Sequence, residues 1–205
     1  MRRLSPGDEA LSGLNSAFLS PEALAALGFR SLGRDVRLHS TCVVVNPQLI
    51  AIGDHVRIDP YCVLSVSGGL TIGNHVHVAS HVVMVGSGAV RLDDFCGISI
   101  GSRLIGSSDD FSGRVLTGPT VPAEFVDMTS TDITVGRHAL VGANSVLLPG
   151  AGLGEGTAVG AMSRVSRHLE PWTVHAGNPL RQLGERRRDL LALEAQLLAR
   201  ERDER

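Results

Sequence analysis

Four side chains able to accept a proton lie in two segments of this 205-residue chain. Asp109 and Asp110 are neighbours in a stretch rich in Ser, Thr, Asp and Pro, and the segment 82–137 around them contains no histidine. His77 and His81 precede a glycine-rich sequence. Carboxylates and imidazoles are common general bases. The candidate catalytic residues are therefore His81, Asp109 and Asp110. Tyr61, His77 and Ser108 are the candidate substrate contacts.

A repeat of 20 residues determines where these side chains lie. Near-equivalent segments begin at Leu32, Ile52, Ile72 and Leu92, and each contains the same six-residue pattern three times. The fifth position of the pattern is small, as a narrow interior requires; its occupants include Val36, Val56, Val76, Cys96, Cys42, Cys62, Val82 and Ser102. A six-residue unit used three times per turn predicts a triangular coil of short parallel strands.

The repeat is interrupted once. It stops at Gly106 and resumes at Val135 with a tighter period of 18 residues, so residues 107–134 form an excursion from the coil. Excursions of this length within a compact repeat are typically functional. The tighter repeat predicts that the coil ends near Val165.

Helices are expected at both ends of the coil. Ser20 and Pro21 predict the N-cap and first turn of a short helix that reaches Leu27 and covers the bottom of the coil. A charged helix is expected over 185–202. One of its faces is expected to pack on a neighbouring surface through Leu190, Leu193 and Leu197. The expected organisation is an arm with a capping helix over 1–31, a coil domain over 32–170 and a C-terminal segment over 171–205.

Composition excludes some classes of protein. The formal net charge is -2, whereas a nucleic-acid-binding protein normally has a basic face. The three cysteines all occupy inward positions, which favours small buried side chains in a reducing compartment. The chain has no apolar signal run and no stretch of about 18 apolar residues. We therefore expect a cytoplasmic protein without integral membrane contact.

Five runs in the second half of the chain carry a family resemblance. Residues 133–138, 141–150 and 159–163, with the ending at 170–172 and 176–179, resemble the hexapeptide-repeat acyltransferases. Within that superfamily the chain is most similar to sugar and nucleotide-sugar acetyltransferases. These include enzymes that acylate 4-amino-4,6-dideoxyhexoses for surface polysaccharides, a subgroup to which the start of the excursion is similar.

The resemblance implies a fold, an assembly and a donor. The fold is an all-β, left-handed parallel β-helix, an exception to the right-handed crossover rule. The assembly is a homotrimer with active sites between adjacent subunits, and the donor is acetyl-CoA, lying beside the tight upper turns, with no metal expected. The positions that match the family's CoA contacts are Ala143, Ala161, Ser166 and, near the CoA nucleotide, Arg181.

The start of the excursion bears on the acceptor. Related acetyltransferases that act on sugar hydroxyls commonly have a histidine there, whereas this chain has Ser107, Ser108, Asp109 and Asp110. An amine is nucleophilic once neutral and needs less help than a hydroxyl. We therefore expect an acetyl-CoA-dependent acetyltransferase of an amino sugar, nucleotide-linked and of the 4-amino-4,6-dideoxyhexose type. The two aspartates would orient the amine or receive its proton, although paired aspartates also cap turns.

Three alternatives remain at this stage. The first is O-acetylation of a sugar or an antibiotic, with His81 as the base. The second is a non-catalytic trimeric scaffold. The third is a zinc-dependent carbonic anhydrase, which requires three histidines that converge between subunits. His75, His77 and His81 are close in sequence, but no second pair follows a turn or two later.

The remaining histidines are interpreted as structural. His55, His75 and His138 occupy equivalent positions and are expected to stack at one corner with Asp35 and Phe95. His39 and His168 have no evident partner in the sequence and are interpreted in the same way. His175 lies in the CoA-type ending, so the only substrate that it could contact is the donor.

Overall fold

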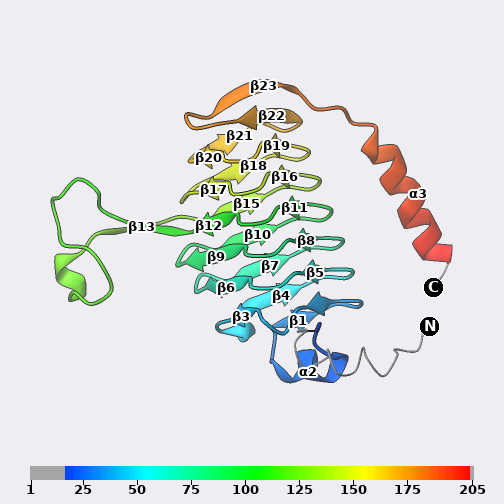
Figure 1. Ribbon diagram of the computed structural model, residues 1–205, viewed down its shortest axis with the longest axis horizontal. Coiled ribbons are helices and arrows are strands. Elements are labelled where there is room, and N and C mark those ends of the chain that lie inside the picture. The colour runs from blue at the N-terminus through cyan, green and yellow to red at the C-terminus, as the bar shows by residue number, and fades with distance from the viewer. Residues whose placement is uncertain (1–16, 204–205) are drawn as a thin grey trace, which may run out of the picture.

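The chain winds as a left-handed parallel β-helix of triangular cross-section, as the repeat and the resemblance predict (Figure 1). The computed structural model describes residues 17–203. Most of the predicted N-terminal arm, residues 1–16, therefore lies outside the described residues.

Three parallel sheets form the faces of the coil. The first face contains β1 (Ser31–Leu32), β4 (Ile50–Ile52), β7 (Leu70–Ile72), β10 (Val90–Leu92), β15 (Ile133–Val135), β18 (Gly152–Leu153) and β21 (His168–Leu169). The second face contains β2 (Arg37–Leu38), β5 (Arg57–Ile58), β8 (His77–Val78), β11 (Gly97–Ile98), β16 (Leu140–Val141), β19 (Ala158–Val159) and β22 (Thr173–Ala176). The third face contains β3 (Val43–Val44), β6 (Val63–Val66), β9 (Val83–Gly86), β12 (Arg103–Ile105), β17 (Val146–Leu147) and β20 (Arg164–Val165).

The strand register confirms the predicted periods. Ile50 pairs with Leu70, which pairs with Val90, so the lower turns advance by 20 residues. Thr134 pairs with Gly152, an advance of 18. The predicted end of the coil near Val165 is wrong, because Gly152 pairs with His168 in one further turn of only 16 residues. Because this turn is shorter than the turns below it, its residues do not follow the spacing of the repeat, and the sequence pattern does not reveal the turn.

Aliphatic side chains fill the interior. At most 1% of the surface of Ile58, Val78 and Ile98 is exposed, and Leu64 and Met84 are fully buried. Cys62 and Cys96 are buried among them, and Cys42 is half-buried. Burial raises the pKa of the Cys96 thiol to about 12, so this cysteine acts as a small apolar side chain, as predicted.

Corners connect the three faces. The first corner joins the first face to the second, the second corner joins the second to the third, and the third corner leads into the next turn. The second corner has a residue with φ between 56° and 71° in five turns: Tyr61, His81, Gly101, Asn144 and Met162. A left-handed conformation costs a non-glycine residue roughly 1–2 kcal/mol. Because it recurs from turn to turn, it belongs to the coil and is not in itself a sign of a site.

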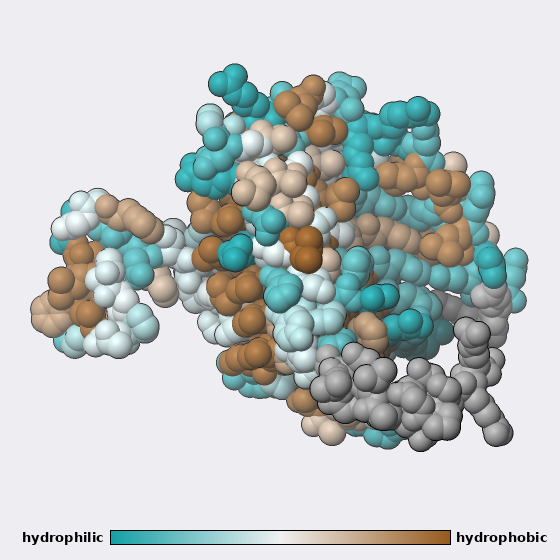
Figure 2. All heavy atoms as spheres, viewed as in Figure 1, coloured by the Kyte–Doolittle hydropathy of each residue, from teal (hydrophilic) through white to brown (hydrophobic). Residues whose placement is uncertain are grey.

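The outward side of the third face is mostly apolar, although the exposed Arg103 and Arg164 also lie on it. Val43 and Val45 are 53% and 41% exposed. Further apolar side chains there are partly exposed: Val63, Val83, Val85, Ile105, Val146 and Leu148. Figure 2 shows hydrophobic residues gathered on the coil beside the base of the excursion.

The excursion is a hairpin that stands away from the coil (Figure 1). Its base is formed by β13 (Ser107–Asp109) and β14 (Met128–Ser130), which pair antiparallel, and its outer part contains a short 3-10 helix, η2 (Ala123–Phe125). The coil resumes at Ile133, two residues earlier than predicted, because Thr134 already pairs with Gly152.

The two ends of the coil are covered differently. At the bottom, α2 (Pro21–Ala26) begins at the predicted N-cap, where the Ser20 hydroxyl accepts a hydrogen bond from the amide of Ala23, and the 3-10 helix η1 (Pro47–Leu49) lies in the first turn. At the top, β23 (Arg181–Glu185) pairs antiparallel with β22. The prediction of a helix over 185–202 is therefore wrong for its first residues, since α3 spans Leu190–Asp203.

The predicted contact face of α3 is also partly wrong. Leu193 is 65% exposed and Leu197 is 40% exposed, so these leucines do not pack on the coil. The side of α3 that lies against the coil contains Glu194, Leu198 and Glu201. Ion pairs with the first corner, which the sequence could not reveal, determine this orientation.

Close approach of successive turns makes a glycine necessary at Gly142. A Cβ atom there would lie 2.5 Å from the backbone nitrogen of Ala161. We expect Gly142→Ala to lower the free energy of unfolding by about 1–3 kcal/mol, because backbone atoms must move. Gly184→Ala is the control, since a Cβ at that position meets nothing within 4 Å. Equal urea midpoints for the two variants would contradict this prediction.

His175 gives the fold a dependence on pH. The side chain is inside the top turn and only 4% exposed, and burial, with a smaller contribution from Arg167, lowers its pKa. The unfolded chain therefore binds a proton at about pH 6.5, where the folded chain does not. As the pH falls below about 6.5, stability decreases, until the lowered pKa of the folded state is passed. We expect urea unfolding to show a shallower loss of stability with acid in His175→Leu than in the wild type; identical pH profiles would refute this.

Candidate functional site

Two of the predicted site residues form a pair on the second corner. The rings of Tyr61 and His81 are stacked, with centroids 5.0 Å apart and planes inclined by 21°. Tyr61 is 55% exposed, and His81 is also exposed. The two residues are 20 apart in sequence, so they lie one turn apart, as the predicted repeat requires. Together the two rings offer a flat aromatic surface and an imidazole that solvent can reach.

His77 lies on the second face, just before this corner, and is held by a carboxylate. Its Nε2 is 2.8 Å from Oδ2 of Asp59, and Nε of Arg57 donates to Oδ1 of the same group at 2.7 Å. Burial opposes ionisation of Asp59, but the hydrogen bonds from His77 and Arg57 outweigh it and lower the pKa of the carboxyl group. Sequence reasoning missed Asp59, although it lies at an outward position one turn below His77.

The two aspartates of the excursion have different environments. Asp110 closes a turn: its carboxylate accepts hydrogen bonds from the amide and hydroxyl of Ser112 and from the amide of Arg114. These contacts, led by the Ser112 hydroxyl, lower the pKa of Asp110. Asp109 is exposed at the end of β13, and its carboxylate accepts one long hydrogen bond, 3.4 Å from the amide of Gly118. The hydroxyl of Ser108 donates to the carbonyl of Asp109.

The single chain does not bring His81 and Asp109 together. His81 immediately precedes the third face at the second corner, whereas the excursion leaves from the third corner beside Gly86. The five residues from His81 to Gly86 span roughly 16 Å at strand geometry. The candidate groups therefore lie at opposite edges of the apolar third face.

The predicted donor contacts divide between the same two edges. Ala143 and Ala161 lie on the second corner, in the two turns that end the coil on the third face, and Arg181 pairs with Ala176 just above them. Ala143 is two strand spacings above His81, or about 10 Å. Ser166 follows β20 and so lies at the third corner. The small side chains leave the backbone of the second corner open to a ligand.

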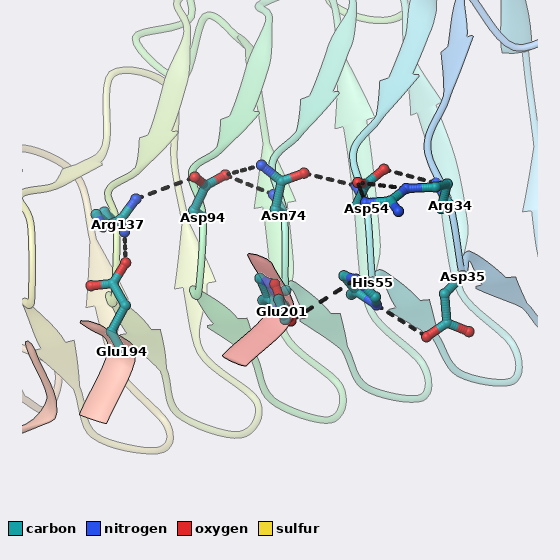
Figure 3. Close-up of polar contacts among 10 residues, drawn as sticks. Arg34, Asp35, Asp54, His55, Asn74, Asp94, Arg137, Glu194 and Glu201 are labelled. Atoms are coloured by element: carbon teal, nitrogen blue, oxygen red, sulfur yellow. Dashed lines mark hydrogen bonds and ion pairs between the residues drawn. The ribbon is translucent and has the colours of Figure 1, made fainter. Parts of the chain in front are cut away.

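The predicted stack at the first corner is confirmed. The rings of His55, His75, Phe95 and His138 follow one another with centroid distances of 4.6–5.2 Å, and Trp172 continues the column. Beside this column runs a ladder in which the side chains of Asp54, Asn74 and Asp94 each accept a hydrogen bond from a backbone amide one turn below (Figure 3). This arrangement explains why polar residues recur at the corner.

α3 lies along that column from His138 down to His55. Oε2 of Glu194 lies 2.7 Å from Nε2 of His138, and Glu194 also pairs with Arg137, which contacts Asp94 (Figure 3). Burial, followed by the charge of Arg137, lowers the pKa of His138. The three histidines that a carbonic anhydrase would need do not converge within the chain: His75 faces α3, His77 contacts Asp59 and His81 stacks on Tyr61.

Within residues 17–203, neither α-helix has the length and apolar character needed to cross a bilayer.

The comparisons with known proteins agree with this architecture. No family model matches the chain. The dTDP-4-amino-4,6-dideoxy-D-glucose acyltransferase of Escherichia coli is 34% identical over 180 residues, which cover 87% of this chain and 94% of the relative. AntD, an N-acyltransferase from Bacillus cereus, was solved in complex with dTDP and 3-hydroxybutyryl-CoA. It superposes with a TM-score of 0.88 at 35% identity, over 92% of this chain and all of AntD.

A variant of AntD in complex with dTDP-4-amino-4,6-dideoxyglucose and coenzyme A superposes with a TM-score of 0.87, again at 35% identity, over 90% of this chain and 99% of that chain. The likeness thus extends over about nine-tenths of this chain. The protein is an acyltransferase and belongs to the family of the dTDP-4-amino-4,6-dideoxy-D-glucose acyltransferases.

Proposed function

We propose that the protein transfers an acyl group from acyl-CoA to the amine of a dTDP-linked 4-amino-4,6-dideoxyhexose. The observation that carries this proposal is the match to all of AntD at 35% identity, because AntD was solved with dTDP and an acyl-CoA. Acetyl-CoA is the donor that the sequence predicts. The 3-hydroxybutyryl-CoA in the AntD complex makes a longer acyl group the second candidate.

The reaction joins the sugar nitrogen to the thioester carbonyl. The ammonium group of the sugar first loses a proton, the neutral amine attacks the carbonyl carbon, and the C–S bond breaks to release CoA thiolate. The second amine proton goes to a base, and the thiolate takes up a proton to become CoA. Asp109 suits the role of base because the residue is exposed and its carboxylate accepts one long hydrogen bond, whereas the Asp110 carboxylate already accepts hydrogen bonds within its own turn.

A threefold assembly would complete the site. The outward apolar side chains of the third face favour burial against other copies of the chain. Around a threefold axis, the second corner of one subunit meets the third corner of its neighbour. His81 of one subunit, with Tyr61 and Ala143, would then face Asp109 and Ser166 of the next. The homotrimer with sites between subunits, expected from the sequence, therefore fits the two-edge arrangement.

The same proposal places the enzyme in the cytoplasm, in the synthesis of a surface polysaccharide or other glycan. Its three cysteines are free, which suits a reducing compartment. Nucleotide-linked sugars and CoA thioesters, as proposed substrates, would have to be available in the same compartment.

Thiol release measures the activity directly. The purified full chain is tested with acetyl-CoA or 3-hydroxybutyryl-CoA against dTDP-4-amino-4,6-dideoxyglucose, the same sugar without the nucleotide, and its 4-hydroxy counterpart. We expect CoA release only with the dTDP-linked amine. Release with the hydroxyl sugar would replace this proposal with O-acylation. Absence of release and of CoA binding would favour a scaffold.

Mixed trimers test the shared site. We expect His81→Ala and Asp109→Ala to reduce activity strongly when each is assembled alone. In random 1:1 co-assembly every mixed trimer regains one intact site, so activity returns to about a quarter of the wild-type value. Co-assembly of two batches of Asp109→Ala is the control and should regain nothing. No recovery in verified mixed trimers would show that the two residues act within one subunit or not at all.

A further inference from the structure

We propose that His55, His75 and Glu201 form a binding site for a divalent transition-metal ion of the zinc type, which fastens α3 to the first corner. Oε1 of Glu201 lies 3.3 Å from Nε2 of His75 and 4.0 Å from Nε2 of His55. The three ligand atoms are all within 4.8 Å of one another. Two imidazoles and a carboxylate are ligands that zinc accepts, with the fourth position left to water.

Asp35 orients the ring of His55 toward Glu201. The Nδ1 atom of His55 is 3.2 Å from Oδ2 of Asp35, and a carboxylate can only accept, so Nδ1 carries the hydrogen. Nε2 is then the ring nitrogen on the side of Glu201, as Figure 3 shows. A carboxylate that holds the far nitrogen of a ligating histidine is also a common feature of zinc sites.

The surroundings of Glu201 leave room for an ion. The three residues line one pocket between α3 and the corner, together with Leu198. Two nearby arginines are paired with other carboxylates, Arg34 with Asp54 and Arg137 with Asp94 and Glu194, although the charge of Glu201 also acts on Arg34. The side chains of His55, His75 and Glu201 are 34%, 17% and 20% exposed, so the site is open to solvent on one side.

Modest adjustments give the site its bonding distances. Zinc–nitrogen and zinc–oxygen bonds of about 2.1 Å place tetrahedral ligand atoms about 3.4 Å apart. His75 and Glu201 already have this spacing, and His55 must approach Glu201. The two rings are stacked with planes 16° apart, so each must turn about its Cβ–Cγ bond to aim at one ion. That torsion is broad in histidine, and the corner is exposed.

Zinc titration of the full chain tests the proposal. The untagged protein is treated with a chelator, titrated with ZnCl₂ by calorimetry and then followed by hydrogen exchange over residues 190–203. We expect one site per chain and slower exchange in α3 when zinc is bound, because an ion shared by the coil and the helix stabilises their contact. No binding, or binding without an effect on α3, would overturn the proposal.

Variants locate the ion. Glu201→Gln should remove both the zinc binding and the zinc-dependent slowing of exchange. Asp35→Asn should weaken zinc affinity about 10- to 100-fold, as expected for a group that orients a ligand. Glu194→Gln is the matched control, since Glu194 is a second carboxylate of α3 that contacts a histidine outside the cluster; it should retain the zinc site. Equal zinc affinity in Glu201→Gln and Glu194→Gln would refute the assignment.

Discussion

Backbone pairing between successive turns is the constraint on which this structure depends. Each strand of the coil is only two to four residues long, and its hydrogen bonds are made to the turns directly below and above it. No strand could persist alone, so stability comes from stacking turns on a continuous aliphatic interior. The strand register between turns is therefore fixed, although the turns are 20, 18 or 16 residues long, and side chains at equivalent positions are forced into columns. Both the ring column of the first corner and the Tyr61–His81 pair are results of that rule.

Because side chains lie in columns, different parts of the coil surface carry different kinds of side chain. The first corner carries polar and aromatic side chains that bind α3, and the third face presents aliphatic side chains outward. The second corner presents small and aromatic residues beside an open backbone. In the proposed trimer, the edges of the coil would supply the reacting groups and the packing of copies would supply the enclosure, so no cleft within one chain is needed.

The repeat made most of the fold predictable, including inward residues such as Val82, the interruption at Gly106 and the first-corner stack. Departures from the repeat were not predictable. The 16-residue top turn does not follow the spacing of the repeat. Residues 181–185 pair with β22, although their charged sequence resembles that of the helix that follows. The orientation of α3 depends on Glu194 and Glu201 meeting residues far away in sequence. The distance between His81 and Asp109 likewise depends on which edge each occupies, which a linear pattern does not state.

The antiparallel strand β23 has a consequence for the length of any assembly. A coil of parallel turns exposes unpaired backbone groups at each end, and such ends can add further turns from another chain without limit. On the second face, β23 occupies the upper edge and runs against the direction of the coil. A turn stacked from a second molecule would therefore meet a reversed strand on this face instead of continuing the parallel ladder, which disfavours end-to-end growth into a fibre.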